Sequence, residues 1–479
     1  MISLDPASTA PLVAQLVEAV SERIRSGSVA PGARLPSVRK LAVQCGVSTL
    51  TVSNAYNRLV ADGLLEARRA SGYFVSARLL DRKAAAPRRK PVQISVDSGW
   101  LLQRVYEEDA FTVKAGCGWL PDSHLFADGI KQALAALARR PDRLVSRYGH
   151  PLGYAPLRRA IQLLLAQRNI ACDPDQILLT HGASQALDLT MRTFLQPGDV
   201  ALVDDPGYCN LYPSLHAMGV TIVGVERTLQ GPSIPALQAL AERYKPKLFF
   251  TNTSFHNPTG TSSTPATAYQ ILRIAEKHDF QIVEDDIYAS FVEETAPSIA
   301  SLDQLGRVIH ISSFSKTISP ALRVGYLACN PENAQRLLRM KMAASLTSSE
   351  ISESIVHSIL TEGQYRLHIA RLRDKLAAEQ KTVADALLSV GLSLFHRPAN
   401  GLFLWAGFGG DPDTAGLAQR AAAKGIMLAP GHLFRADQEP TPWLRFNVAH
   451  ANAPALFRFL ESERPAPGDH GKTGDPPPA

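Results

Sequence analysis

Apolar residues recur at every third or fourth position between residues 11 and 26. That spacing places them on one face of a helix, and Gly27 follows as a stop signal. The residues on this face are Leu12, Leu16, Ala19, Val20 and Ile24. The pattern therefore predicts an amphipathic helix over residues 11–26.

Two more helices are predicted after residue 36. Ser37 can begin a short one, and Ser48 can cap another that runs to Asp62, with Gly46 as the tight turn between them. The following run, "LLEARRASGYFVS", predicts two short strands around a turn at residues 71–72. Two helices joined by a short glycine turn, followed by a hairpin, are typical of a winged helix-turn-helix domain, here over residues 1–76.

The rest of the chain follows a different pattern. Residues 77–97 are rich in Ala, Pro and basic residues, which predicts a flexible basic linker that could span up to about 70 Å. Residues 98–465 alternate short apolar runs with helical segments, which is typical of a mainly parallel α/β sheet. The runs are "QILLT", "VALVDD", "TIVGVE", "KLFFTN", "FQIVED", "RVIHIS" and "RVGYLAC". Residues 466–479 are expected to be disordered.

Charge is distributed unevenly along the 479 residues. Residues 1–90 hold 14 Lys and Arg against 6 Asp and Glu, so they carry the whole excess behind the formal net charge of +6. A small basic module on a near-neutral body indicates a nucleic-acid-binding head. The alternative is that the basic runs only keep the linker solvated.

The cysteines and the hydropathy of the chain limit which cellular compartment and which kinds of site are expected. The five cysteines are scattered singly and form no CxxC pair, so we expect neither a metal site nor a disulfide framework, and a reducing compartment. No run approaches the roughly 18 apolar residues that span a bilayer, and the N-terminus lacks the apolar core of a signal peptide. We expect a cytoplasmic protein with no membrane partner.

Lys316 is the first candidate for chemistry. It lies among serines in "ISSFSKTISPALRVG", where an apolar strand ends. Ligands of α/β folds bind at such strand ends, and a lysine amine there could condense with an aldehyde cofactor. Taken alone, the simpler interpretation is a solvated surface lysine.

Three further strand ends carry candidate residues. Asp285 ends the strand in "QIVEDDIYASF", where a carboxylate could keep a cofactor's pyridine nitrogen protonated; an acidic helix cap or a metal site is the alternative. Asn257, in "TSFHNPTG", could bond a phenolic oxygen or could simply make a turn. In "THGASQALDL", Ser184 and backbone N–H groups could hold a phosphate, or could only begin a helix.

In this order and spacing, the motifs resemble those of the fold-type I aminotransferases, which use pyridoxal 5′-phosphate (PLP). The resemblance covers residues 100–460 and implies a large sheet domain with a smaller C-terminal α+β subdomain. It implies that Lys316 is the catalytic lysine that binds PLP as a Schiff base, and that Asp285 pairs with the pyridinium nitrogen. The remaining cofactor residues that it implies are Tyr288 and Asn257 at the 3′-oxygen, Tyr208 on the ring, and Ala183, Ser184, Ser313, Arg323 and, across a dimer interface, Tyr148 at the phosphate. Arg445, in "WLRFNVA", would clamp the carboxylate of a substrate or effector.

The N-terminal region resembles the GntR-type winged helix in "APGARLPSVRKLA" and "GVSTLTVSNAYNRLVADGLL". This resemblance implies double-stranded DNA as a partner, with the start of the third helix at base edges and basic side chains at phosphates. The residues implied are Arg39, Ser48, Thr49, Thr51, Ser53 and Asn54, with Arg58, Arg68 and Arg69 at phosphates. Thr49 departs from the pattern, because relatives often carry arginine there. A protein-docking module is the alternative.

A GntR head on an aminotransferase-like body is the arrangement of the MocR-type regulators. The resemblance implies a PLP-responsive transcription factor, a head-to-tail homodimer whose body senses an amine, an amino acid or PLP itself. The alternative is a working aminotransferase with an accessory DNA-binding head, which the intact lysine, aspartate and arginine permit. The segment "KAGCGWLPDSHLF" has no second arginine that would mark a dicarboxylate.

Overall fold

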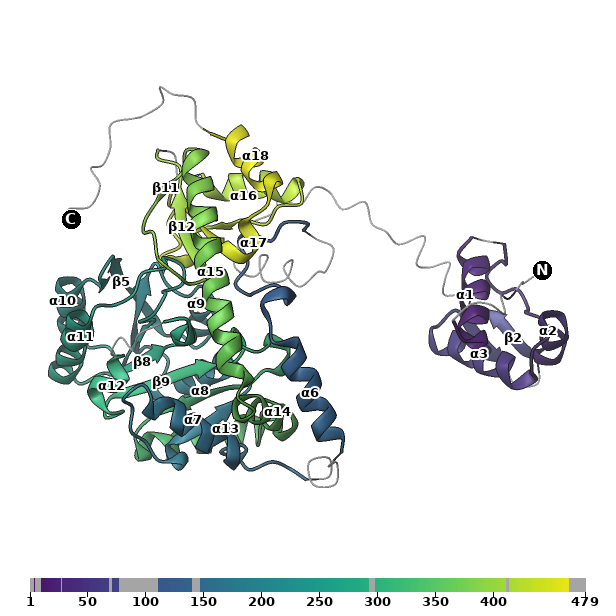
Figure 1. The fold of residues 1–479 in the computed structure, drawn as a ribbon, viewed down its shortest axis with the longest axis horizontal. Coiled ribbons are helices and arrows are strands. Elements are labelled where there is room, and N and C mark those ends of the chain that lie inside the picture. Colours follow the sequence, from purple (N-terminus) through teal and green to yellow (C-terminus); the bar gives the residue numbers. More distant parts are fainter. Residues whose placement is uncertain are drawn as a thin grey trace. The chain divides into compact units, whose positions relative to one another are not determined.

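The computed structural model describes residue 4 and residues 10–26, 28–68, 71–76, 111–139, 147–292, 298–410 and 413–464. The predicted linker, the predicted tail and Arg69 lie outside the described residues. The chain divides into two compact units, Met1–Ile94 and Ser95–Ala479, called here the head and the body (Figure 1).

The head is a winged helix-turn-helix, which confirms the predicted elements. Its helices are α1 (Leu12–Arg25), α2 (Val38–Cys45) and α3 (Thr49–Ala61), and its strands are β1 (Leu65–Arg68) and β2 (Gly72–Val75). The two strands pair antiparallel, so they form the wing.

Local chemistry explains where the head's helices begin and end. The hydroxyl oxygens of Ser37 and Ser48 accept hydrogen bonds from the backbone N–H groups of Lys40 (3.3 Å) and Thr51 (3.0 Å). Gly46 ends α2 in the left-handed conformation, at φ 65°, which only glycine adopts without strain. Leu12, expected on the buried face of α1, is 42% exposed because it lies in the first turn, ahead of the packed core.

The body's main sheet has eight strands in the order β3-β10-β9-β8-β7-β4-β5-β6. Six of them run in one direction, while β10 and β6 run against their neighbours, so the predicted mainly parallel sheet is confirmed. The strands are β3 (Ile177–Thr180), β4 (Val200–Asp205), β5 (Thr221–Thr228), β6 (Gly231–Pro232), β7 (Leu248–Thr251), β8 (Gln281–Asp285), β9 (Val308–Ser313) and β10 (Gly325–Ala328).

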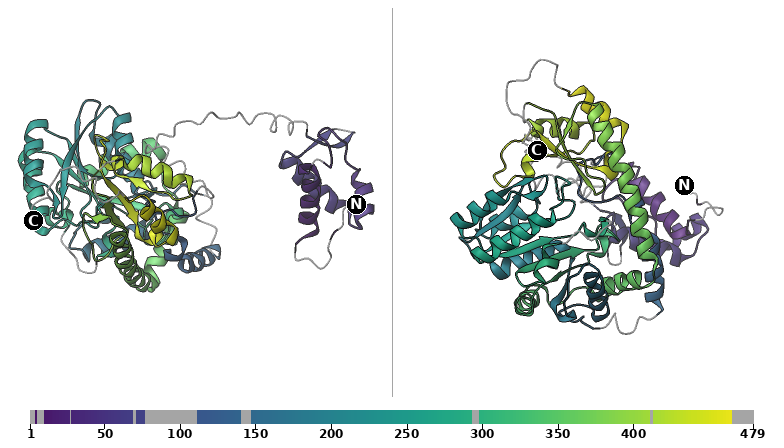
Figure 2. Two further views of the ribbon diagram at one scale, coloured as in Figure 1. Left: turned by 90° about the horizontal axis from the view of Figure 1, so that it is seen from above. Right: turned by 60° about the vertical axis from the view of Figure 1, so that its left-hand side comes forward.

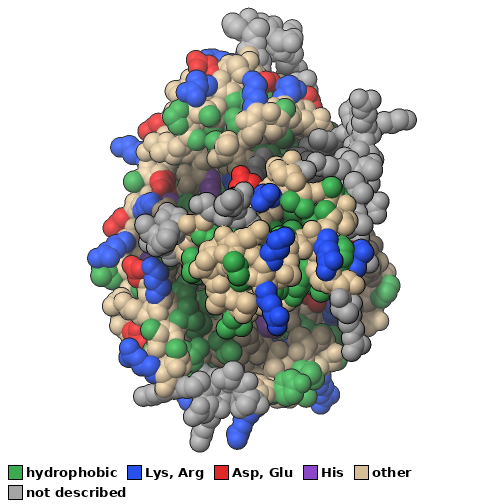
Figure 3. Space-filling model, turned by 90° about the vertical axis from the view of Figure 1, so that its right-hand side faces the viewer, with side chains coloured by type: hydrophobic (Ala, Val, Ile, Leu, Met, Phe, Trp, Pro, Cys, Tyr) green, Lys and Arg blue, Asp and Glu red, His purple; other side chains and the backbone are tan. Residues whose placement is uncertain are grey.

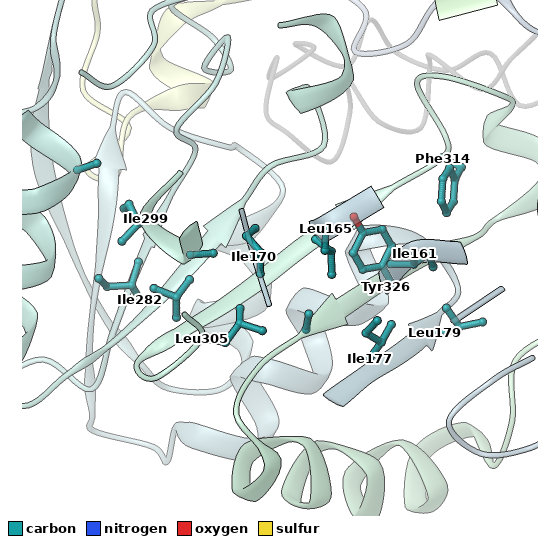
Figure 4. Packing of buried hydrophobic residues seen from close by; sticks show 14 of the residues in the cluster. Ile161, Leu165, Ile170, Ile177, Leu179, Ile282, Ile299, Leu305, Phe314 and Tyr326 are labelled. Carbon is teal, nitrogen blue, oxygen red and sulfur yellow. The ribbon is translucent and has the colours of Figure 1, made fainter. Parts of the chain in front are cut away.

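Both faces of this sheet are covered, because successive strand residues point to opposite sides. In β3, Ile177 and Leu179 enter the cluster that packs under α7 (Ala155–Ala166), α11 (Pro265–His278), α12 (Ile299–Asp303) and α14 (Glu350–Thr361) (Figure 4). Leu178, between them, enters the cluster under α8 (Gly182–Phe194), α9 (Leu211–Ala217) and α13 (Pro331–Ser345). The remaining helices of this part are α6 (Ala127–Ala138) and α10 (Ile234–Tyr244).

A smaller C-terminal α+β subdomain completes the body, as the resemblance implied. The long helix α15 (Gln364–Ser389) runs from the main sheet's layer into it (Figures 1 and 2). Its sheet has the order β11-β12-β14-β13, and α16, α17 and α18 pack around it. These elements are β11 (Ser393–Leu394), β12 (Phe403–Gly407), β13 (Ala429–Pro430), β14 (Trp443–Asn447), α16 (Thr414–Ala423), α17 (Val448–Ala451) and α18 (Pro454–Ser462).

The surface is mixed in character. On the face that Figure 3 shows, exposed apolar side chains are interspersed with basic and acidic ones. Within the described ranges, no helix combines the length and the apolar character that crossing a membrane requires.

Candidate functional site

Ten of the predicted site residues line one cavity of the body, with a volume of about 870 Å³. They come from strand ends, from the loops that follow them and from the small subdomain, which are far apart in the sequence. The ten are Ala183, Ser184, Tyr208, Asn257, Asp285, Tyr288, Ser313, Lys316, Arg323 and Arg445. The carboxyl ends of parallel strands meet at one edge of the sheet, which is why the motifs converge.

Lys316 projects into this cavity from the loop after β9. Its Nζ donates a hydrogen bond of 2.5 Å to the carbonyl oxygen of Gly118. Burial lowers the pKa of the Lys316 amine to about 8; Arg445 adds to the shift, while Cys117 and Asp285 oppose it. A lysine with such a pKa is partly neutral near pH 7.5, and only the neutral amine is a nucleophile.

Asp285 lies at the end of β8 on the cavity wall. Burial raises the pKa of its carboxyl to about 7, although the N–H of Ile287, 3.4 Å from Oδ1, and the Lys316 amine lower it. Its backbone carbonyl accepts a hydrogen bond of 2.6 Å from the side-chain amide of Asn252. A buried carboxylate without a full cation beside it is poised to pair with a positively charged ligand atom.

Arg445, from β14, brings the small subdomain to the same cavity. Its side chain is 5% exposed and donates hydrogen bonds to Asn257 Oδ1 (2.8 Å) and to the carbonyl oxygen of Gly116 (2.7 Å). Its guanidinium lies over the rings of Phe403 and Phe434, each 4.7 Å from the ring centroid. The buried Nε has no hydrogen-bond partner among the described residues.

Two tyrosines supply aromatic walls. Tyr208 follows β4, and its hydroxyl accepts a hydrogen bond of 3.0 Å from Asn210. Tyr288 is 2% exposed and packs edge-on against Phe403, with ring centroids 5.7 Å apart. Burial raises the pKa of Tyr208 to about 12 and that of Tyr288 well above its usual range, so both hydroxyls keep their protons.

The other end of the cavity is suited to an anion. Gly182 opens α8 at φ +75°, and a Cβ there would lie 2.8 Å from Nη2 of Arg323. Gly325 allows the start of β10 to lie close to the start of α8, because a Cβ on Gly325 would lie 2.6 Å from the carbonyl carbon of Gly182. The helix start, the exposed Arg323 and the hydroxyls of Ser184 and Ser313 therefore gather in one place.

Tyr148 is the one predicted cofactor residue that the structure does not bring to the cavity. It is 85% exposed on the surface of the body. Its expected role is across a dimer interface, which a single chain does not test.

Sequence reasoning missed several residues that build the cavity. Gly118 and Trp119 line it; they lie in "KAGCGWLPDSHLF", which sequence reasoning placed at the pocket without naming either residue. Asn447 holds this segment by donating to the carbonyl oxygen of Trp119 (2.7 Å). Asn252 joins two of the predicted residues, since its Oδ1 also accepts from the backbone N–H of Asn257 (3.0 Å). Its place at the end of the "KLFFTN" strand was the signal that could have found it.

In the head, the predicted DNA-contacting residues gather around α2 and α3. Arg39, Thr49, Asn54 and Arg58 are exposed, while Thr51 and Ser53 are half-buried. The Ser48 hydroxyl also lies 2.8 Å from that of Thr51, so both hydroxyls already have local partners. In the wing, the Arg68 guanidinium stacks on Phe74, 4.5 Å from the ring centroid. Sequence reasoning passed over Leu50, which is 68% exposed between Thr49 and Thr51.

Two family models cover most of the chain. Residues 122–462 match aminotransferase class I and II, and residues 12–75 match the gntR family of bacterial regulatory proteins. The HTH-type transcriptional regulator TauR of Rhodobacter capsulatus is 30% identical over 451 residues, 90% of this chain and 91% of the relative. The chain belongs to the MocR-type GntR regulators. A second relative, the uncharacterized HTH-type transcriptional regulator YdcR of Escherichia coli, is 29% identical over 445 residues, 91% of this chain and 94% of the relative.

Solved structures agree on the fold of this MocR-type regulator's body. The α-aminoadipate aminotransferase LysN of Thermus thermophilus, complexed with N-(5'-phosphopyridoxyl)-L-leucine, is 25% identical with a TM-score of 0.69; the match covers 76% of this chain and 93% of LysN. The kynurenine aminotransferase of Pyrococcus horikoshii is 22% identical with a TM-score of 0.71, covering 81% and 100%. The body therefore has the aminotransferase fold, joined to a regulator's head.

Proposed function

We propose that this protein is a PLP-dependent, DNA-binding transcriptional regulator whose body senses an amine or an amino acid. The observation that carries the proposal is that two domains of different kinds belong to one polypeptide chain. A head of a DNA-binding regulator family is joined to a body whose cavity brings together Lys316, Asp285 and Arg445.

The residues of the cavity suit PLP in three places. The partly neutral Lys316 amine matches an aldehyde, the buried Asp285 carboxyl matches a protonated pyridine nitrogen, and the Gly182 end with Arg323 matches a phosphate. When bound, PLP supplies an aldehyde that condenses with primary amines and a ring that withdraws electrons from them. The protein's part is to hold the ring against Tyr208 and to present the Lys316 amine.

Arg445 is the proposed carboxylate clamp for an amino-acid effector. Its planar guanidinium can hold a carboxylate with two parallel hydrogen bonds. In the structure its guanidinium donates hydrogen bonds to Asn257 Oδ1 and to the carbonyl oxygen of Gly116. An incoming carboxylate would therefore replace neutral acceptors by a charged one, which strengthens the bonds.

The head is proposed to bind operator DNA through α3 and the wing. Exposed Thr49 and Asn54 are short polar side chains that can reach base edges in the major groove, and the exposed Arg58 and Arg68 can neutralise phosphates. We also propose a head-to-tail homodimer, since Tyr148 is 85% exposed and would reach a cofactor only in a second copy.

Gel retardation tests the proposal. Purified protein is mixed with the DNA upstream of its own gene, with and without PLP, and then with a series of amines and amino acids. We expect specific retardation that an effector changes only in the PLP-loaded protein, and no such change in Lys316→Ala. Absence of retardation under every condition would overturn the DNA-binding proposal.

A second candidate function is transamination. The pKa of Lys316 near 8 is as compatible with it as with sensing, because a transaminase lysine must also accept and return a proton. A screen of amino donors with 2-oxoglutarate or pyruvate measures it directly. Multiple turnovers with any pair would establish an enzyme, and absence of turnover across the screen would exclude those reactions.

A further inference from the structure

A second cavity, with a volume of about 570 Å³, lies in the body. Its walls come from α7, from the strands β9 and β10, and from the start of α15. It has the size and the mostly apolar lining with a few polar groups that are typical of small-molecule sites. None of the proposed roles of PLP, DNA or the amine effector uses it.

The floor of this second cavity is apolar. Leu165, Phe314 and Tyr326 belong to the cluster under α7, and Figure 4 shows the Tyr326 ring beside Leu165. Ile369 of α15 belongs to the same cluster and also lines the cavity, and Leu163 lines it while remaining 65% exposed. An occupant with an apolar or aromatic body would remove this surface from water, which stabilises the complex.

Among the described residues of the lining, the charge has one sign. It includes Arg168, Arg366 and Arg373, and no described lining residue is Asp or Glu. The charge of Arg168 is compensated within the protein, because its Nη1 lies 2.5 Å from the buried Asp286 carboxylate.

The other two arginines keep most of their donors for a ligand. Arg373 uses its Nε on the carbonyl oxygen of Ser290 (2.9 Å). In the described part of the chain, the exposed side chain of Arg366 forms neither a hydrogen bond nor an ion pair. Among the described residues these two guanidinium groups have no carboxylate partner, and beside an apolar floor they favour an anion with an apolar body.

We propose that this cavity is a binding site for an organic anion with an aromatic or branched apolar body. The site is also placed to influence the cofactor cavity. Ser313 lines both cavities, and its neighbours continue directly into the Lys316 loop. Ser290, which holds Arg373, is two residues beyond Tyr288 of the cofactor cavity.

A matched pair of fluorescent probes tests the charge and the apolar requirement separately. 8-Anilinonaphthalene-1-sulfonate has an apolar body and an anionic group, while N-phenyl-1-naphthylamine has the same body without the charge. Each is titrated into the PLP-loaded full-length protein, so that the cofactor cavity is filled. We expect the sulfonate to bind at least about tenfold more tightly, as one charge-assisted hydrogen bond contributes on this scale.

Two pairs of variants assign the binding to this cavity. Arg366→Glu should weaken the sulfonate at least about tenfold and leave the neutral probe unchanged. Arg371→Glu, an exposed arginine of the same helix that does not line the cavity, should change neither. Leu163→Gln should weaken both probes, whereas Leu367→Gln, on an exposed leucine outside the lining, should weaken neither.

The result that overturns the proposal is equally specific. Equal affinity for the two probes removes the argument from charge, and equal effects of the Arg366 and Arg371 variants place the sulfonate elsewhere. Neither outcome bears on DNA retardation or on PLP binding, so failure here is separate from failure of the proposed function. A shift of the PLP absorbance when the sulfonate binds, lost in Arg366→Glu, would establish the coupling.

Discussion

The pKa of Lys316 gives the most direct quantitative prediction. An ordinary lysine amine has a pKa near 10.5, whereas burial lowers that of Lys316 to about 8. At pH 7 roughly one amine in ten is then neutral, against roughly one in three thousand for an ordinary lysine. The neutral fraction should rise about tenfold between pH 7 and pH 9 and change little above that.

The test is to measure, at several pH values, how fast PLP reacts with the cofactor-free protein, using absorbance to monitor the reaction. Butylamine, an amine of ordinary pKa, is the control, since it corrects for the ionisation of PLP itself. Its neutral fraction rises about a hundredfold over the same range. The rate with the protein, divided by the rate with butylamine, should thus fall about tenfold from pH 7 to pH 9.

A constant ratio across this range would refute the reasoning, because it would mean that Lys316 titrates like a solvated lysine. The signal must also vanish in Lys316→Ala. That control is needed because burial lowers the pKa of Lys341 to about 8 as well. Lys341 is not expected to react, since its Nζ lies outside the cavity and donates to the carbonyl oxygens of Pro151 (2.6 Å) and Leu179 (2.8 Å).

Three further predictions follow from named contacts. Asp285→Asn should weaken PLP binding at least about tenfold in a spectral titration, because the charge opposite the pyridine nitrogen is lost; unchanged affinity would contradict the assignment. Gly325→Ala should lower the free energy of unfolding by about 1–3 kcal/mol more than Gly409→Ala in a denaturant titration, since a Cβ at Gly325 would lie 2.6 Å from the backbone of Gly182 whereas one at Gly409 would meet nothing within 4 Å; equal effects of the two variants would contradict this. Leu50→Ala should abolish any preference for thymine over uracil in the operator, because an exposed leucine on α3 can contact only the methyl group that distinguishes them; an equal preference in the variant would exclude that contact.

The sequence predicts the fold well where its signals are local. Serines at helix starts, Gly46 in the turn and alternating apolar runs each specify a backbone conformation within a few residues, and the structure has those elements. The prediction that Leu12 is buried was wrong, because periodicity identifies a helix face but not where packing along that face begins.

The sequence identified the charged residues that line the cavity, but not the residues that hold them in place. Lys316, Asp285 and Arg445 are residue types that need an explanation when they border apolar strands. Gly118 contributes only a carbonyl oxygen, to Lys316, and every residue has one. Asn252 could be suspected from its place at the end of a strand, but its bonds to Asp285, 33 residues away, and to Asn257 follow from no motif in the sequence.

The cofactor cavity by itself does not separate a sensor from an enzyme, because both need the same first event. Recognition of an amine would require that the incoming neutral amine can replace Lys316 in its bond to PLP, with the Asp285 carboxyl opposite the ring nitrogen and a clamp such as Arg445 for a carboxylate. Transamination adds one requirement, that Lys316 returns a proton to the substrate after it has been displaced. A regulator gains from the first event alone, provided that the liganded body differs in free energy from the free one. The decisive comparison is therefore between one equivalent of amine and many: a single stoichiometric spectral change that alters DNA binding supports the sensor, and continued product formation supports the enzyme.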